Sequence, residues 1–299
     1  MKKSIFNAGL VLLAAAVLVS ACNNKTETPK ALVTVTVNDF TITQEDFPAA
    51  QHAPQRAAVA PADYNGVGAM TLAFYNSEGT EVYKTTQVKS DNTTYTTFGT
   101  FTASLPIGNY TMVAVGYAYY DGDVFVLTGP TEAGFTSERP RETFSATQDV
   151  TVTNTTPLNL NVTLSRISAK LNIVSTDNRP ASATKIRTTV SKGGKDFNPT
   201  TGLALSDAGF TQTNNPSSAV GATISVSSFP FLYADEETMT VTIEVLDADD
   251  NVLATKVVNN VPFKRNRSTK LQGALFSTSA STASFQLDTG WLTEETVNF

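Results

Sequence analysis

The sequence predicts an all-β protein made of two antiparallel β-sandwiches in tandem. Short segments in which apolar and polar residues alternate recur along the chain, and no segment after residue 22 has the 3.6-residue period of an amphipathic helix. Threonine and valine, which favour strands, are frequent in these segments. With 299 residues, the chain is long enough for a leader and two domains of about 100 to 150 residues each.

Residues 1–21 have the order of a lipoprotein signal peptide. Two lysines precede the apolar run Leu10 to Val19, and small residues then lead directly to Cys22. We therefore expect signal cleavage between Ala21 and Cys22, with the Cys22 thiol carrying a lipid and residues 22–30 forming a polar tether. The alternatives are a free reactive thiol and a membrane-spanning helix, but the apolar run has only about half of the roughly 20 residues that a span requires.

Composition limits the partners that we expect. The net charge is −6 and the sequence pI is about 4.9, which argues against nucleic acid and against basic patches on anionic lipid. Cys22 is the only cysteine, so no disulfide is expected and stability must come from burial. Asn23 follows Cys22 and gives no sign of inner-membrane retention, so the lipid is expected to hold the protein at the outer membrane.

The first predicted strand is Ala31 to Thr43. Val33, Val35 and Val37 alternate with polar residues, and the phase then shifts so that Phe40 and Ile42 share a face. This pattern predicts a strand with a bulge near Asn38–Asp39.

Residues 47–63 interrupt the alternation. They hold three prolines and seven alanines without a two-residue period, which is typical of an exposed linker. Arg56 is its only long basic side chain. This residue either keeps an Ala/Pro segment soluble or is a protease cleavage site.

Two sets of alternating segments follow, separated at Ser165–Arg166, and define an amino-terminal sandwich at 31–165 and a carboxyl-terminal sandwich at 166–299. The first set has predicted strands at 69–75, 101–105, 110–119, 124–128, 149–153 and 158–164, and the second has strands at 167–173, 184–190, 223–227, 238–246, 252–258 and 268–276.

Three blocks resemble the recurring blocks of the FimB/Mfa-type fimbrial subunits, namely Leu105–Ala114, Leu164–Leu171 and Asn260–Phe276. The resemblance implies two transthyretin-like sandwiches in a lipoprotein that is a fimbrillin or a fimbrial anchor, located in the outer membrane, at the cell surface or in the fimbrium. It also implies a role in cell adhesion and partners that are other fimbrial subunits.

In stalk members of that family, a protease removes the segment that contains the first strand, and a neighbouring subunit's strand fills the groove. Ala31 to Thr43 matches the removed segment, and Arg56 matches the basic residue after which cutting occurs. The resemblance suggests Ala283 to Phe299 as the donor strand. Anchor members keep both their amino terminus and their lipid, and the sequence does not choose between the two roles.

Catalytic and metal-binding patterns are weak. His52 is the only histidine, so no Ser/His/Asp triad and no His-rich metal site can form. Asp247, Asp249 and Asn251 have the spacing that opens a calcium loop, but the glycine and glutamate of that loop are missing, so an acidic hairpin turn is expected. We expect no catalytic residue, no metal, no cofactor, no small-molecule substrate and no enzymatic activity.

Other charged groups have ordinary structural explanations. Asp235–Glu236–Glu237 is expected to face solvent, and the basic cluster of Lys264, Arg265, Arg267 and Lys270 is expected to be structural, with docking of an anionic partner as its alternative.

A second class of function remains open, that of an outer-membrane surface lipoprotein that binds glycans. The aromatic group that would serve it is Tyr117, Tyr119 and Tyr120 beside Asp121 and Gly122, although alternation places at least half of these tyrosines in the core.

Overall fold

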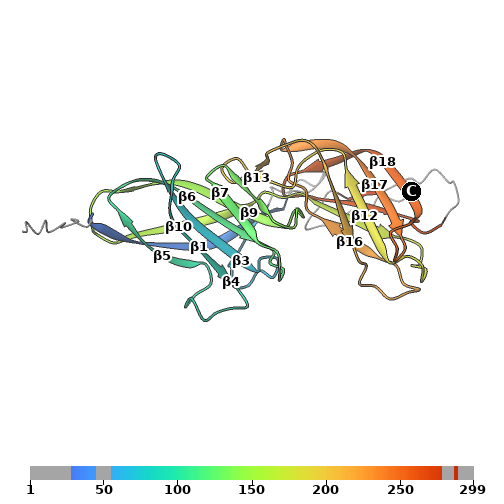
Figure 1. Ribbon diagram of the computed structural model, residues 1–299, viewed down its shortest axis with the longest axis horizontal. Helices are drawn as coiled ribbons and strands as arrows, with labels where there is room; N and C mark the ends of the chain where they lie inside the picture. The colour runs from blue at the N-terminus through green and yellow to red at the C-terminus, as the bar shows by residue number, and fades with distance from the viewer. Residues whose placement is uncertain (1–27, 45–54, 278–285, 289–299) are drawn as a thin grey trace, which may run out of the picture.

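The computed structural model describes residues 28–44, 55–277 and 286–288, and within these ranges it contains twenty β-strands and no helix. No membrane-spanning helix is therefore found in the described part of the chain. The strands build two sandwiches that lie end to end, with a small sheet between them (Figure 1). The all-β tandem sandwich predicted from the sequence is confirmed.

One long sheet forms the first sandwich. Its order is β2-β1-β10-β9-β6-β3-β4, with β5 also paired to β1. Because β10 and β9 pair only through Ser165–Ser145 and Arg166–Phe144, the sheet turns at this point and its two parts face each other across one apolar core. The strands are β1 (Lys30–Gln44), β2 (Gln55–Val59), β3 (Ala69–Asn76), β4 (Glu81–Val88), β5 (Thr100–Pro106), β6 (Gly108–Tyr117), β9 (Thr143–Val152) and β10 (Leu158–Arg166).

Two four-stranded sheets form the second sandwich and enclose a separate core. One sheet has the order β16-β11-β19-β20 and the other has the order β15-β12-β17-β18. The strands are β11 (Lys170–Ser175), β12 (Lys185–Val190), β15 (Phe210–Asn214), β16 (Ser225–Ser228), β17 (Glu236–Leu246), β18 (Val252–Lys264), β19 (Ser268–Gly273) and β20 (Gln286–Asp288).

The small sheet joins the two halves of the chain. It has the order β14-β13-β8-β7, in which β7 (Phe125–Gly129) and β8 (Glu132–Phe135) come from the first half, and β13 (Phe197–Asn198) and β14 (Leu203–Ala204) from the second. Both halves contribute to a third apolar cluster at this sheet, which includes Tyr75 and Val113 from the first half and Phe197 and Phe231 from the second. The two sandwiches thus share buried surface as well as a covalent connection.

Each sandwich also contains one parallel pair, β1 with β10 and β11 with β19. In each case the first strand of the sandwich lies between this parallel partner and an antiparallel one, which is β5 for β1 and β16 for β11. β1 and β11 are therefore equivalent strands of two similar units.

Candidate functional site

The candidate site is β1 together with the groove that holds it. Along its first half, β1 pairs with β10 in parallel, from Val33–Leu158 to Val37–Val162, and with β5 in antiparallel fashion, from Lys30–Pro106 to Thr36–Thr100. Both edges of its backbone are thus hydrogen-bonded to other strands of the sandwich.

The side chains of β1 follow the alternation that the sequence predicts. Val33 and Val35 are fully buried and Val37 is nearly so, whereas Leu32, on the opposite face, is 49% exposed. The register shifts between Val37 and Asp39, as expected for the predicted bulge, and returns Phe40 to the buried face. Without the bulge, Phe40 would point away from the core.

Phe40 anchors the far end of β1 in an aromatic group. Its ring centroid lies 4.8 Å from that of Phe144 in β9 and 5.8 Å from that of Tyr64, and the Tyr64 and Phe144 rings meet edge to face. Such pairs add to the stabilisation that burial alone provides.

A buried charged group lies directly beside these rings. The Arg166 guanidinium, whose side chain is 1% exposed, is 4.8 Å from the Phe144 ring centroid, and Arg166 Nη2 pairs with Glu142 Oε1 at 2.9 Å. Nη2 also donates to the Tyr64 hydroxyl at 2.7 Å, and Nη1 donates to Asn266 Oδ1 at 2.8 Å. The Tyr64 hydroxyl donates in turn to Glu142. Arg166 therefore ties the end of β1 to the second sandwich, which supplies Asn266.

Removing β1 would expose a groove between β5 and β10. The groove would have unpaired backbone groups along both edges and apolar pockets for Val33, Val35, Val37 and Phe40. Such an opening is costly in water and is satisfied by another strand with matching alternation.

The expected linker at 47–63 is wrong in part, because residues Gln55–Val59 form β2. This strand pairs in antiparallel fashion with the second half of β1, from Phe40–Val59 to Gln44–Gln55. Arg56 lies within it, opposite Thr43, and β2 is the outermost strand in the described order of the sheet. Alanine-rich β2 has little strand propensity, so its conformation comes from the edge of β1 that it covers.

Other predicted site residues lie outside the described part of the chain. These are Ala21 and Cys22 at the signal cleavage position, and His52 in the segment before β2. The proposed donor Ala283 to Phe299 is described only at Gln286–Asp288, which forms β20 at the edge of β19.

The basic cluster has the structural role that was expected. Lys264 pairs with Glu236 at 2.6 Å and Arg265 with Asp235 at 2.7 Å, and Arg267 is buried. These contacts form the turn between β18 and β19 and hold it near the junction of the sandwiches, where Arg265 also donates to the Thr201 carbonyl at 2.8 Å.

The acidic sequence at 247–251 forms the predicted hairpin turn. Asp247 accepts hydrogen bonds from the backbone amides of Asp249 and Asn251, each at 2.9 Å, between β17 and β18. The described residues contain no group of three or more potential metal-ligating side chains.

The expectation that at least half of the three tyrosines lie in the core is wrong, because β6 ends at Tyr117 and the alternation does not continue beyond it. Tyr117 is buried and stacks on Phe125 with ring centroids 4.5 Å apart, whereas Tyr119 and Tyr120 are exposed. The Arg141 guanidinium lies 4.0 Å from the Tyr120 ring centroid. Sequence reasoning missed Arg139 and Arg141, because nothing in their local pattern shows that β15 lies next to them.

The fold and the site together define a class of protein, a tandem β-sandwich in which the first strand closes a groove in the first domain. The chain belongs to the family of unknown function DUF6562, whose model matches residues 30–298. No match is found among the curated proteins.

Solved structures with a similar fold include the fimbrial anchor protein Mfa2 from Porphyromonas gingivalis. It is 12% identical, the match covers 89% of this chain and 99% of that one, and the TM-score is 0.50. A fimbrial assembly protein from Parabacteroides distasonis is 14% identical over 90% of this chain and 98% of that one, with a TM-score of 0.39. At these identities the likeness concerns the fold alone.

Proposed function

We propose that this protein is a structural subunit or membrane anchor of a bacterial surface fimbria, assembled by β-strand exchange and serving cell adhesion without enzymatic activity. The observation that carries the proposal is the position of β1, an amino-terminal strand held between β5 and β10 by backbone pairing and a continuous apolar face. The fold shared with a fimbrial anchor protein supports it.

Location follows from the amino terminus. A lipid on Cys22 would hold the protein in the outer membrane, and the tether before β1 would place the first sandwich at the cell surface. Two or more acyl chains give stable anchoring, whereas one alone binds only marginally.

Burial explains why the groove must always be filled. Val33, Val35, Val37 and Phe40 each contribute about 1.5 to 3 kcal/mol, or about 6 to 12 kcal/mol together. This is comparable to the whole stability of a typical domain, about 5 to 15 kcal/mol. An incoming donor must therefore replace β1 step by step, with apolar residues at every second position.

The hairpin of β1 and β2 provides a place for controlled release. A cut after Arg56 separates β1 from the rest of the sandwich, whereas the equivalent strand β11 stays joined to the sandwich at both of its ends. β2 has a free edge in the described sheet, and proteins commonly add an extended partner at such an edge. A protease can therefore recognise β2 without unfolding the core.

The carboxyl-terminal stretch from Ala283 to Phe299 is the proposed donor. Within it, the described residues of β20 pair with β19 through three positions, from Lys270–Asp288 to Gln272–Gln286. We propose that this pairing is exchanged for pairing in a neighbour's groove when the stretch acts as a donor.

The test is the amino-terminal residue of the protein recovered from intact cells, combined with negative-stain microscopy of fimbriae. A stalk or tip subunit begins after Arg56, and Arg56→Ala then abolishes its incorporation while monomer folding is kept. Arg187→Ala, a basic residue in a strand of the second sandwich, is the matched control and polymerises normally. An anchor instead keeps acylated Cys22 at the base of the filament.

Two results contradict parts of the proposal. If Arg56→Ala protein enters filaments as wild type does, strand release at this site is wrong and the anchor role replaces it. If the wild-type protein is found with no fimbria at all, the fimbrial proposal itself fails.

A further inference from the structure

A cavity of about 480 Å³ lies where the two sandwiches meet, and no residue of β1 lines it. Residues between Ala118 and Glu142 line it from the first half of the chain, and Gln212, Asn214, Ser227 and Phe229 line it from the second. Its volume is in the range of small-ligand sites, about 300 to 1,000 Å³, but many of its lining side chains are polar.

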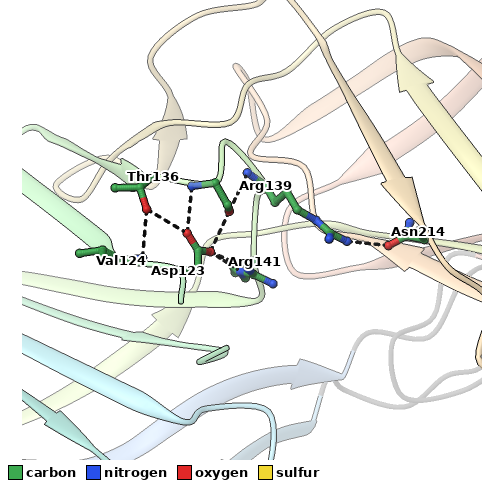
Figure 2. A network of polar contacts seen from close by, with 7 residues as sticks. Asp123, Val124, Thr136, Arg139, Arg141 and Asn214 are labelled. Atoms are coloured by element: carbon green, nitrogen blue, oxygen red, sulfur yellow. Dashed lines mark hydrogen bonds and ion pairs between the residues drawn. The ribbon is translucent and has the colours of Figure 1, made fainter. Parts of the chain in front are cut away.

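One wall of the cavity is rigidly built around Asp123. Its carboxylate accepts hydrogen bonds from Arg141 Nε at 3.0 Å and Nη2 at 2.5 Å, and from the amide and hydroxyl of Ser137 at 2.9 and 2.8 Å (Figure 2). Burial alone would raise the pKa of Asp123, but these hydrogen bonds outweigh it and hold the pKa below its ordinary value. Arg141, fixed in this way, covers the ring of Tyr120 at the rim.

Arg139 lines the same cavity but has no carboxylate partner among the described residues. Its Nη2 donates to Asn214 Oδ1 at 2.7 Å, across the junction of the sandwiches, and its buried Nε has no hydrogen-bond partner (Figure 2). Burial lowers the pKa of Arg139, and the charge of Arg141 lowers it further. A half-buried guanidinium that is held by one neutral oxygen lacks the anion that normally compensates such a charge.

Two amide atoms beside Arg139 are also without partners. Gln212, which is 5% exposed, donates through Nε2 to Asn214 Oδ1 at 3.0 Å and to the Ser227 carbonyl at 3.3 Å. Because both of these partner atoms are acceptors, the amide group of Gln212 must point its nitrogen toward them. Its buried Oε1 then lies on the other side and has no hydrogen-bond partner. Asn214 Oδ1 accepts from both Arg139 and Gln212, so Asn214 Nδ2 is the remaining donor, and it also lacks a partner.

We propose that this cavity binds a carbohydrate that carries a carboxylate, such as a uronic acid. Asn214 Oδ1 fills half of the two-pronged fork that an arginine offers to a carboxylate. A ligand carboxylate takes the whole fork, Nε and Nη2, when the Arg139 side chain turns toward the cavity. This exchange releases Asn214 Oδ1 from Arg139, and Asn214 Nδ2 and Gln212 Oε1, which have no partner, form hydrogen bonds to the ligand.

These two unpartnered amide atoms favour a hydroxyl over a peptide group. A hydroxyl accepts one hydrogen bond and donates another at a single oxygen. It therefore suits the donor Asn214 Nδ2 and the acceptor Gln212 Oε1, whose side chains are hydrogen-bonded to each other. In a trans peptide, the N–H and C=O point in opposite directions. A sugar with a carboxylate next to ring hydroxyls meets both requirements, and Tyr120, which stays 54% exposed with Arg141 over its ring, lies at the rim.

The test is calorimetric titration of the full chain in mild detergent with three probes, methyl β-glucuronide, methyl β-glucoside and acetate. The glucuronide is expected to bind at least about tenfold more tightly than either of the others, which lack the carboxylate or the hydroxyls. Arg139→Gln is expected to remove this preference. Arg179→Gln is the matched control, because Arg179 also has an unpartnered buried Nε but does not line the cavity.

A second variant keeps the test valid if Arg139→Gln does not fold. Asn214→Asp has almost the same shape and places a carboxylate of the protein itself on the Arg139 fork, so the variant is expected to fold and to lose glucuronide binding. The proposal is overturned by any of three results: no saturable binding of the glucuronide to the wild type, equal binding by Asn214→Asp, or acetate binding as tightly as the glucuronide.

Discussion

Replacing Phe40 by alanine tests whether β1 is held in its groove by one buried face. Phe40 is fully buried and packs on the rings of Phe144 and Tyr64. Truncating a buried phenylalanine to alanine costs about 3 to 5 kcal/mol, from lost burial and from the cavity left behind. Leu32→Ala removes a side chain of the same strand that is 49% exposed, and it is expected to cost no more than about 0.5 kcal/mol.

The assay is urea unfolding of the full chain, followed by far-ultraviolet circular dichroism. With a slope of about 2 to 3 kcal/mol per molar urea, Phe40→Ala is expected to lower the midpoint of the first sandwich by about 1 to 2.5 M. Leu32→Ala should leave the midpoint almost unchanged. Equal losses from the two variants, or a loss below about 1 kcal/mol for Phe40→Ala, would refute the groove and the bulge that returns Phe40 to it.

Three further predictions concern the anchor and the buried charges. Cys22→Ser should leave an unprocessed precursor that is not labelled by a palmitate analogue, and equal labelling would rule out the lipoprotein. Arg166→Met should destabilise the protein by about 3 to 5 kcal/mol in the same urea assay, because it leaves the buried carboxylate of Glu142 without an opposite charge, with the Tyr64 hydroxyl as its remaining described partner. Lys84→Met, which breaks an exposed ion pair, should cost at most about 1 kcal/mol. Similar losses from the two variants would contradict this account. Because the folded pKa of Asp123 is lowered, its contribution to stability is present above the unfolded pKa of ~3.9 and is lost as the pH falls through the folded pKa. The melting temperature of Asp123→Asn should therefore depend less on pH below about 4 than that of the wild type. An unchanged pH dependence would count against this role of Asp123.

The alternation in β1 made this strand and its bulge predictable. Valines at every second position predict one buried face, and the shift at Asn38–Asp39 is needed to keep Phe40 on that face. β2 could not be predicted in the same way, because alanine and proline give neither alternation nor strand propensity. It forms because the second half of β1 offers an open edge.

β3 shows a different limit. The sequence predicts a strand with one apolar face, and Met70, Leu72 and Phe74 do pack in the first core. Ala73 and Tyr75, on the other face, are equally buried, because they belong to the apolar cluster at the small sheet that joins the two halves. The predicted division into domains at 31–165 and 166–299 stays a prediction, and this shared cluster works against a clean separation of the two halves.

The sequence by itself determined the fold class and the faces of the long strands, because the two-residue period is a local property of the chain. The tertiary structure decided which surfaces cover those faces and which distant side chains meet. Arg166 with Glu142, and Arg139 with Asn214, are brought together only when strands far apart in the chain come to lie side by side. No local pattern encodes such meetings, since they depend on the order of strands in the sheets and on how the two sandwiches pack.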